Sequence, residues 1–149
     1  MIAFLSLAAA TALATYDCTV RPPVVELVKD GEITSADLRI PSSKWQFSIK
    51  FVDDDGYWAE VSWPTDPIQA QGKFPALPIA DGSYAFASLS RGPCLFTEAM
   101  CMSQFTLVNT GKADAQVLIS PSALTRDQDK THSVMAVVIT GTCSRKPAA

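Results

Sequence analysis

Residues 44–63 read KWQFSIKFVDDDGYWAEVSW, and this stretch carries the clearest structural signal in the chain. Large apolar residues occupy every second position in its first half, and the alternation resumes after the segment DDDG at 53–56. Because successive side chains of a β-strand point to opposite faces, a period of two predicts a strand with one buried face. Asp and Gly between the two halves favour a tight turn. We therefore predict a β-hairpin with strands over 44–52 and 57–63.

The same period of two recurs along the rest of the chain. A second hairpin is predicted around the Gly-containing segment 109–112, and residues 133–142, SVMAVVITGT, form the β-branched apolar run expected of a central strand. Further strand patterns cover 24–29, 37–40, 84–89, 103–108 and 113–120. No sustained helical period of 3.6 residues is present beyond position 14. The predicted fold class is all-β, a small antiparallel sandwich or up-and-down barrel of about 7–8 strands with few short helical turns.

Two segments interrupt this strand pattern. Residues 64–78 contain four prolines, which lack the backbone N–H of a strand ladder, so we expect an ordered surface loop there and not a central strand or a long helix. Residues 120–123 read SPSA. Because Pro after Ser suits the first position of a helix, one helical turn is expected at this point. The polar segment 125–131 is expected to be a second long connection.

The first 14 residues, MIAFLSLAAATALA, predict a signal peptide. They carry no charged side chain and end in the small-x-small pattern Ala12-Leu13-Ala14 that signal peptidase accepts, although the usual basic n-region is missing. The uncharged run stops at Asp17, short of the roughly 20 residues that span a bilayer, which disfavours a membrane anchor. Cleavage before Thr15 leaves residues 15–149 as a single disulfide-stabilised β domain without a membrane span. We expect this domain to be exported, to a periplasmic or extracellular location.

Export changes the interpretation of the four cysteines. In an oxidising compartment an even number of cysteines predicts disulfides, here two, with three possible connectivities. We favour Cys18 with Cys143, because the first and last strands of a closed sheet are neighbours. Cys94 would then pair with Cys101 across a short loop. A zinc site is disfavoured, since the chain has no CxxC pair and a single histidine.

Composition and motifs narrow the function class. The chain has 149 residues, 48% of them hydrophobic, with a net charge of -3 and a pI of about 5.0. These values predict a packed core and disfavour a nucleic-acid partner, because phosphate recognition needs a basic surface. The sequence contains no GxSxG, HExxH or GxxxxGK[ST] motif, and His132 is its only histidine. We therefore predict a protein that is not an enzyme and has no cofactor or metal.

One of the three tryptophans has a distinctive setting. Trp45 and Trp63 belong to the apolar face of the predicted hairpin, whereas Trp58 alternates with Glu60 and Ser62. Aromatic side chains on a polar face serve as anchors for ligands or partners. Packing of Trp58 under the proline-rich segment is the structural alternative. The ligand or partner surface that we predict consists of Trp58, Glu60, Trp63 and Phe74.

Three functions remain open at this stage. The first is a non-enzymatic binding or structural module of a bacterial-type cell envelope or secretome, acting on a protein partner. The second is a lipocalin-like carrier of a small apolar ligand, a comparison that rests on architecture alone. Its cavity would be lined by Trp45, Phe47, Tyr57, Val61 and Tyr84. The third is a soft-metal protein for Cu(I), with ligands from Met100, Cys101, Met102, Met135 and His132. Strand alternation disfavours it, because Cys101 would point away from the two flanking methionines.

Overall fold

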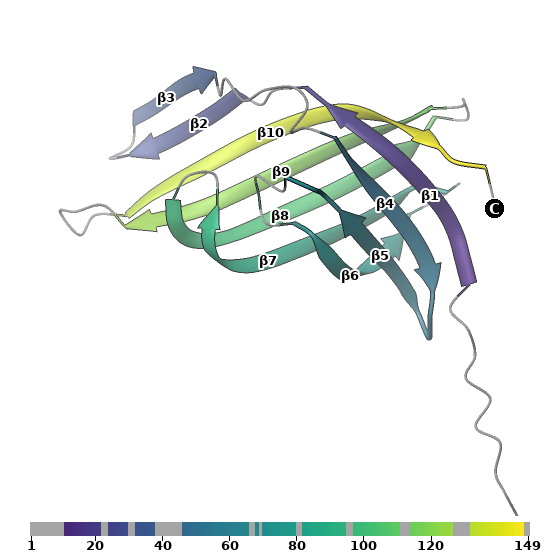
Figure 1. Cartoon of the computed structure of the whole chain (residues 1–149). Helices are drawn as coiled ribbons and strands as arrows, with labels where there is room; N and C mark the ends of the chain where they lie inside the picture. The colour runs from purple at the N-terminus through teal and green to yellow at the C-terminus, as the bar shows by residue number, and fades with distance from the viewer. Residues whose placement is uncertain are drawn as a thin grey trace, which may run out of the picture.

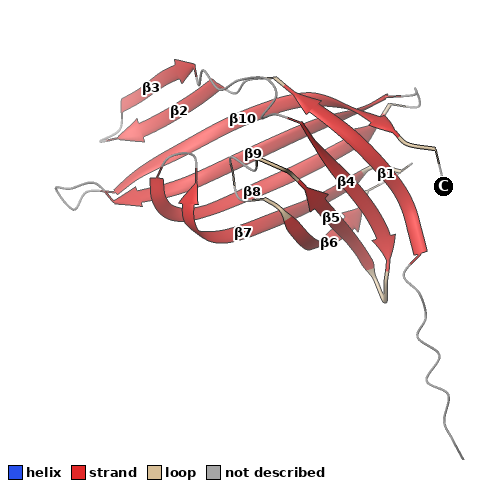
Figure 2. Ribbon diagram, in the orientation of Figure 1, coloured by secondary structure: helices blue, strands red, loops and turns tan. Residues whose placement is uncertain are grey.

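The computed structural model shows a protein built from antiparallel β-strands (Figures 1 and 2). It describes residues 11–21, 24–29, 32–37, 46–65, 68, 70–79, 82–94, 97–110, 114–126 and 132–147. Side chains are described in these ranges except at 24–29, 34–37, 90–94, 97–101, 123–126 and 132–135. The described residues form no helix, and therefore none that is long and apolar enough to cross a membrane.

Eight of the described strands follow one another around a closed barrel, each antiparallel to its neighbours. In spatial order they are β1 (Thr11–Val20), β4 (Gln46–Asp53), β5 (Tyr57–Ser62), β6 (Gly72–Pro78), β7 (Tyr84–Cys94), β8 (Thr97–Asn109), β9 (Asp114–Arg126) and β10 (His132–Arg145). Pairing of β1 with β10 closes the ring. The all-β class predicted from the sequence is confirmed, and the closed ring selects the barrel over the sandwich. The hairpin predicted over 44–63 is present as β4 and β5.

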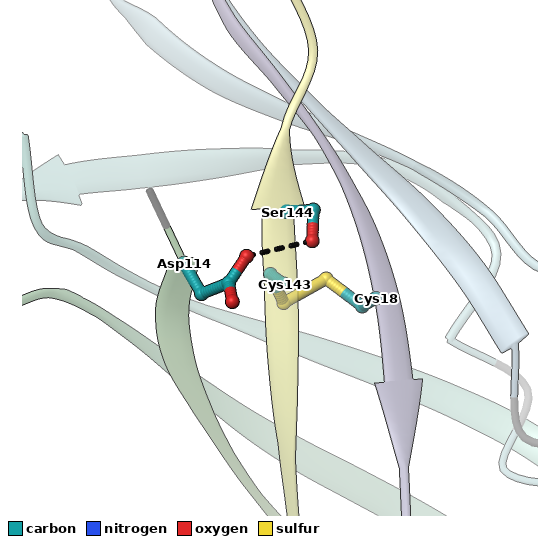
Figure 3. The surroundings of a disulfide bond; sticks show 4 residues. All are labelled: Cys18, Asp114, Cys143 and Ser144. Atoms are coloured by element: carbon teal, nitrogen blue, oxygen red, sulfur yellow. Dashed lines mark hydrogen bonds between the residues drawn. A yellow bond between two sulfur atoms is a disulfide. The ribbon is translucent and has the colours of Figure 1, made fainter. Parts of the chain in front are cut away.

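The β1–β10 pairing, which we call the seam, joins the two ends of the chain (Figure 3). Five residues of each strand pair in register, with Cys18 directly opposite Cys143. These two cysteines form a disulfide with Cα atoms 4.0 Å apart, which confirms the pairing predicted from their positions in the chain. On the neighbouring strand β9, Asp114 accepts a hydrogen bond of 2.7 Å from the hydroxyl of Ser144 (Figure 3). The disulfide thus lies in the middle of the contact that closes the barrel.

Gly141 permits the close approach of the two seam strands. A Cβ atom at this position would lie 2.6 Å from Cγ1 and 2.7 Å from Cα of Val20, and it would also collide with the carbonyl oxygen of Thr19. Such distances to backbone atoms leave no room for any side chain. The absence of a Cβ atom at position 141 is therefore a condition for closing the barrel at this level.

A further hairpin extends β10 beyond the barrel, as Figure 1 shows. β2 (Val24–Lys29) pairs with the first half of β10, and β3 (Glu32–Asp37) pairs with β2. β1 and β2 thus lie end to end along β10. The sequence predicted a strand over 24–29, which is confirmed. It placed the next strand at 37–40, whereas β3 ends at Asp37 and residues 38–40 lie outside the described part.

Aromatic and branched side chains fill the interior of the barrel. Three stacked ring pairs, with centroids 3.9 to 4.5 Å apart, run through it: Phe51 with Tyr84, Phe47 with Trp63, and Phe86 with Phe105. Along β4 the alternation predicted from the sequence is present, since Phe47, Ile49 and Phe51 are buried while Gln46 and Lys50 are exposed. Burial of each such ring contributes about 2 to 3 kcal/mol. The core is therefore the main source of stability of the fold.

The proline-rich segment contains a strand, so the expectation of a loop over 64–78 is wrong for its second half. β6 pairs with β5 through residues 72–75 and with β7 through residues 76–78. Each half of β6 therefore has a partner on one side only. Pro75 and Pro78 are tolerated because a strand with one partner leaves alternate N–H groups out of any ladder.

Residues 120–123 belong to the 13-residue strand β9, so the expected helical turn is also wrong. The ladder with β10 is interrupted opposite Pro121, which has no N–H to donate, and resumes at Ile119. On its other side Pro121 pairs with Ser103 of β8. Pairing of the rest of β9 on both sides outweighs the local signal for a helix start.

β1 begins four residues before the expected signal-peptide cleavage point. In the uncleaved chain its first residues pair with β4, with a register irregularity between Ala12 and Ala14. Cleavage before Thr15 would remove this irregular part and keep the regular pairing from Thr15 opposite Lys50 to Thr19 opposite Gln46. The signal peptide stays a prediction, and the pairing of β1 with β10, from Tyr16 to Val20, lies outside the residues it would remove.

Candidate functional site

Trp58 lies half-buried on the outer face of β5, close to the β4–β5 turn. Its Nε1 donates a hydrogen bond of 3.0 Å to the backbone oxygen of Asp54. The ammonium group of Lys73, on β6, lies 5.2 Å from the centroid of the indole ring and forms an ion pair of 2.7 Å with Asp54. A cation at this distance is attracted by the π face of the ring. Trp58 is therefore held in one orientation by groups from the turn and from the next strand.

The turn next to Trp58 depends on two residues with positive φ. Asp55 has a φ of 52°, which Asp adopts more readily than most residues, and Gly56 has a φ of 128°, which favours glycine. The N–H of Asp54 donates a hydrogen bond of 2.9 Å to the carbonyl of Gly56. The segment DDDG thus forms the turn that the sequence indicated, and this turn supplies the acceptor for the indole.

Glu60 lies between two lysines on the same outer face. The strand register places it opposite Lys50 on β4 and opposite Lys73 on β6. The distance from Lys50 Nζ to Glu60 Oε2 is 3.6 Å, and both side chains are more than 40% exposed. An exposed ion pair of this kind contributes little to stability. Its consequence is a strip of alternating charge beside Trp58.

The other two residues of the predicted surface point inward. Trp63 is fully buried and stacks on Phe47, so it belongs to the core and does not contribute to a contact surface. Phe74 is half-buried and packs against the core, with its ring centroid 6.2 Å from that of Phe86. The structure therefore brings Trp58 and Glu60 together on one outer face and separates both from Trp63 and Phe74.

Two depressions adjoin near the seam, and Thr19 borders both. The first, of about 380 Å³, is lined by Asp17, Cys18, Thr19, Gln46, Phe47, Ser48, Ser62 and Pro64. The second, of about 340 Å³, is lined by Thr19, Val20, Arg21, Gln116, Thr140, Gly141 and Thr142. Both linings mix hydroxyl and amide groups with apolar surface, and neither contains a histidine. These depressions can donate and accept hydrogen bonds, and each contains one charged side chain, Asp17 in the first and Arg21 in the second.

Two tyrosines, Tyr16 and Tyr57, and Arg145 lie near the buried Tyr84. Burial raises the pKa of Tyr84 above its ordinary value of 10.0, the phenols of Tyr16 and Tyr57 raise it further, and Arg145 acts in the opposite direction. Tyr84 is therefore neutral at physiological pH, and its ring stacks on Phe51. The group is a packed aromatic layer, of which Tyr57 is the exposed member.

The hypothesis of a copper site stays untested. Among the described side chains, no group of three or more His, Cys, Asp or Glu could hold a metal ion. Met102 is described and 41% exposed on the outer face of β8. The side chains of the other proposed ligands lie outside the described part of the chain.

The second disulfide also stays a prediction. The register of the β7–β8 hairpin places Cys94 opposite Thr97 and Cys101 opposite Ser90. The two cysteines are thus offset by four positions along the strands, about 13 Å at the rise of a β-strand, whereas a disulfide requires Cα atoms within about 7 Å. Their side chains lie outside the described residues. A bond between them requires a different register at the end of this hairpin.

The sequence analysis did not predict several large apolar side chains on the outside of the barrel. They lie 41% to 68% exposed at outward positions of β6 to β10: Leu77, Leu89, Met102, Val108, Leu118 and Val138. The alternation along each strand predicted which face is buried in the core. The sequence analysis did not consider whether the opposite, outward face carries charged residues. The missed signal is the lack of charged residues at the outward positions of 116–122 and 136–142.

Comparison with protein families, with curated proteins and with solved structures finds no match to this chain.

Proposed function

We propose that this protein is an exported, non-enzymatic binding module that contacts a protein partner through the outer face of β4–β6, centred on Trp58. The observation that carries the proposal is the fixed orientation of this indole on the outside of a barrel whose described interior is filled. Tryptophan is the residue most typical of interaction hot spots. A side chain that is already ordered loses little entropy on binding.

The packed interior favours this proposal over a carrier of apolar ligands. Of the residues expected to line a ligand cavity, Phe47, Val61 and Tyr84 are buried in the core, and Tyr57 is exposed; Trp45 lies outside the described residues. A stack of rings at centroid distances of 3.9 to 4.5 Å leaves no space for a ligand among its members. Uptake of an apolar molecule would therefore require these stacked side chains to move apart.

Charge around Trp58 supports a polar protein surface as the partner. Lys73 and Asp54 contact the indole, and the ion pair of Lys50 with Glu60 lies on the same outer face. Charged groups at the rim of an interface mainly speed up association and fix the orientation of the partner, and they add little affinity. The Cys18–Cys143 disulfide supports an oxidising location for the module.

The experiment is native mass spectrometry of the protein purified from its own exported fraction, together with two alanine variants. Trp58→Ala removes the proposed anchor, and Leu118→Ala removes an exposed apolar side chain on β9, four strands away around the barrel. Circular dichroism verifies that both variants are folded. We expect a stoichiometric complex with another protein that Trp58→Ala abolishes and Leu118→Ala retains.

Two results would overturn the proposal. One is a bare polypeptide, or a complex that Trp58→Ala leaves intact. The other is an adduct of a few hundred daltons that survives purification, which would assign the protein to the carriers of small ligands.

A further inference from the structure

The two depressions near the seam adjoin at Thr19, which belongs to both linings. The first is lined mainly from β1, β4 and β5, and the second from β1, β9 and β10, with volumes of about 380 and 340 Å³. Volumes of this size are typical of sites for small molecules. We call the two depressions together the seam groove.

The main chain beneath the seam groove is already used by the sheet. Thr19 pairs with Thr142 of β10 on one side and with Gln46 of β4 on the other. Thr142 in turn pairs with Gln116 of β9. A peptide that binds as an added strand needs a free sheet edge, and the described strands offer none at this point. Recognition in the seam groove therefore depends on side chains.

The walls of the seam groove are held in place by the seam itself. The disulfide of Cys18 with Cys143 joins the two strands on which the depressions meet (Figure 3). Cys18 belongs to the lining of the first depression, and Gly141, which allows the close approach of these strands, belongs to the lining of the second. A site that is ordered before binding loses little entropy when a ligand enters.

Most polar side chains of the lining both donate and accept hydrogen bonds. They are Thr19, Gln46, Ser48 and Ser62 in the first depression, and Thr19, Gln116, Thr140 and Thr142 in the second. Within the described part of the chain, these hydroxyl and amide groups form no hydrogen bond with another protein group. A hydroxyl or a primary amide offers donors as well as acceptors. The seam groove thus presents a set of uncharged groups of both kinds to a ligand.

Two charged side chains complete the lining. The carboxylate of Asp17 forms an ion pair of 2.9 Å with Lys146, so its charge is balanced. Arg21 is exposed, and its backbone N–H donates a hydrogen bond of 2.9 Å to the carbonyl of Thr140, which holds its main chain at the end of the second depression. A carboxylate accepts several hydrogen bonds, and a guanidinium donates several in a fork.

We propose that the seam groove binds a neutral saccharide. Every hydroxyl of a sugar both donates and accepts hydrogen bonds, which matches the hydroxyl and amide groups of the lining. A phosphate-bearing ligand needs several cations, whereas the described lining contains the single cation of Arg21. The net charge of -3 also disfavours an acidic sugar. An apolar ligand would bury these polar groups without partners, which is costly.

This inference does not rest on the proposed protein contact of Trp58. Trp58 belongs to neither lining. Binding of a sugar and formation of a protein complex are separate measurements, so the failure of one proposal leaves the other standing.

The test is isothermal titration calorimetry of the purified exported protein with three trisaccharides, namely chitotriose, cellotriose and maltotriose. We expect at least one of them to bind with a dissociation constant below about 1 mM. Thr19→Leu removes the hydroxyl that the two depressions share and places a larger apolar side chain between them. Thr106→Leu makes the same change on β8, opposite the exposed Leu118 and outside both linings, and is the matched control. Thr19→Leu should weaken binding at least about 10-fold, and Thr106→Leu should bind like the natural chain.

Two further variants keep the test informative if circular dichroism shows that Thr19→Leu is not folded. Gln46→Ala removes an amide from the first depression, and Gln116→Ala removes one from the second. Each should weaken binding by about 3- to 10-fold, because each removes a hydrogen bond between neutral groups.

Three results would overturn the proposal. One is the absence of binding of all three trisaccharides up to about 10 mM. Another is binding that neither glutamine variant weakens. The third is a loss in Thr106→Leu equal to that in Thr19→Leu, which would place the sugar elsewhere on the barrel.

Discussion

Removal of the Cys18–Cys143 disulfide gives the sharpest prediction on stability. The bond joins residues 125 positions apart, so it closes almost the entire chain into a loop. In the chain-entropy model, closing a loop of this length lowers the entropy of the unfolded state by an amount equivalent to about 5 kcal/mol at 25 °C. Both cysteines are buried in the core. We therefore choose alanine as the replacement, because a serine would add the cost of two buried hydroxyl groups.

The expected loss in the Cys18→Ala/Cys143→Ala variant is about 3 to 5 kcal/mol of unfolding free energy. This is a large part of the roughly 5 to 15 kcal/mol that stabilises a typical domain. Urea denaturation of the two proteins, followed by tryptophan fluorescence, measures the difference. Trp63 is a suitable probe, since it is fully buried and stacked on Phe47 in the folded state. The slope against urea should rise in the variant, because an unfolded chain without the cross-link exposes more surface.

A matched control removes the other two cysteines. If Cys94 and Cys101 form a bond, it closes a much shorter loop and contributes no more than about 2.5 kcal/mol by the same relation. If they form no bond, the Cys94→Ala/Cys101→Ala variant loses less unfolding free energy than this value. A loss below about 1 kcal/mol in the Cys18→Ala/Cys143→Ala variant would refute the argument that the bond stabilises the barrel through closure of the chain.

Three further predictions follow from the core and the seam. Gly141→Ala should destabilise the protein by about 2 to 3 kcal/mol in thermal or urea unfolding, because its Cβ atom collides with backbone atoms of β1; an unchanged midpoint would contradict the close approach. Trp63→Ala should cost about 3 to 5 kcal/mol, because it leaves a cavity beside Phe47, and retention of the natural urea midpoint would contradict its place in the core. The raised pKa of Tyr84 means that the folded state holds the phenolic proton more tightly than the unfolded state, so stability should be constant up to about pH 10 and fall as the pH rises further. Tyr84→Phe should reduce this alkaline loss in urea unfolding at several pH values, and an equal loss in both proteins would assign it to other groups.

Local alternation was enough to predict the hairpin of β4 and β5 and the strands β2 and β10. In the hairpin, the turn residues 53–56 and the period of two point to the same structure, so local preference and tertiary pairing agree. The disulfide of Cys18 with Cys143 could also be inferred, since it follows from the rule that the terminal strands of a closed sheet are neighbours. Of the predicted surface, Trp58 and Glu60 do lie together on an outer face, as their alternation along one strand implies.

The errors have one physical cause, namely that a strand depends on its neighbours. Pro75 and Pro121 are poor strand residues by themselves. β6 accepts Pro75 because its halves pair with different strands, and β9 accepts Pro121 because its ladder with β10 is interrupted at Pro121 and Ser120. Neither arrangement can be read from a window of local sequence.

The sequence by itself determined which residues face inward along most strands, because the two-residue period of a β-strand is a property of the backbone. Only the tertiary structure decided between barrel and sandwich. That choice depends on whether β1 pairs with β10, and these two strands are separated by more than 100 residues in the sequence. It also decided which outward residues of neighbouring strands lie side by side, such as Thr106, Leu118 and Thr140. Neighbours across strands are set by register, and register is fixed by hydrogen bonds between segments far apart in the sequence.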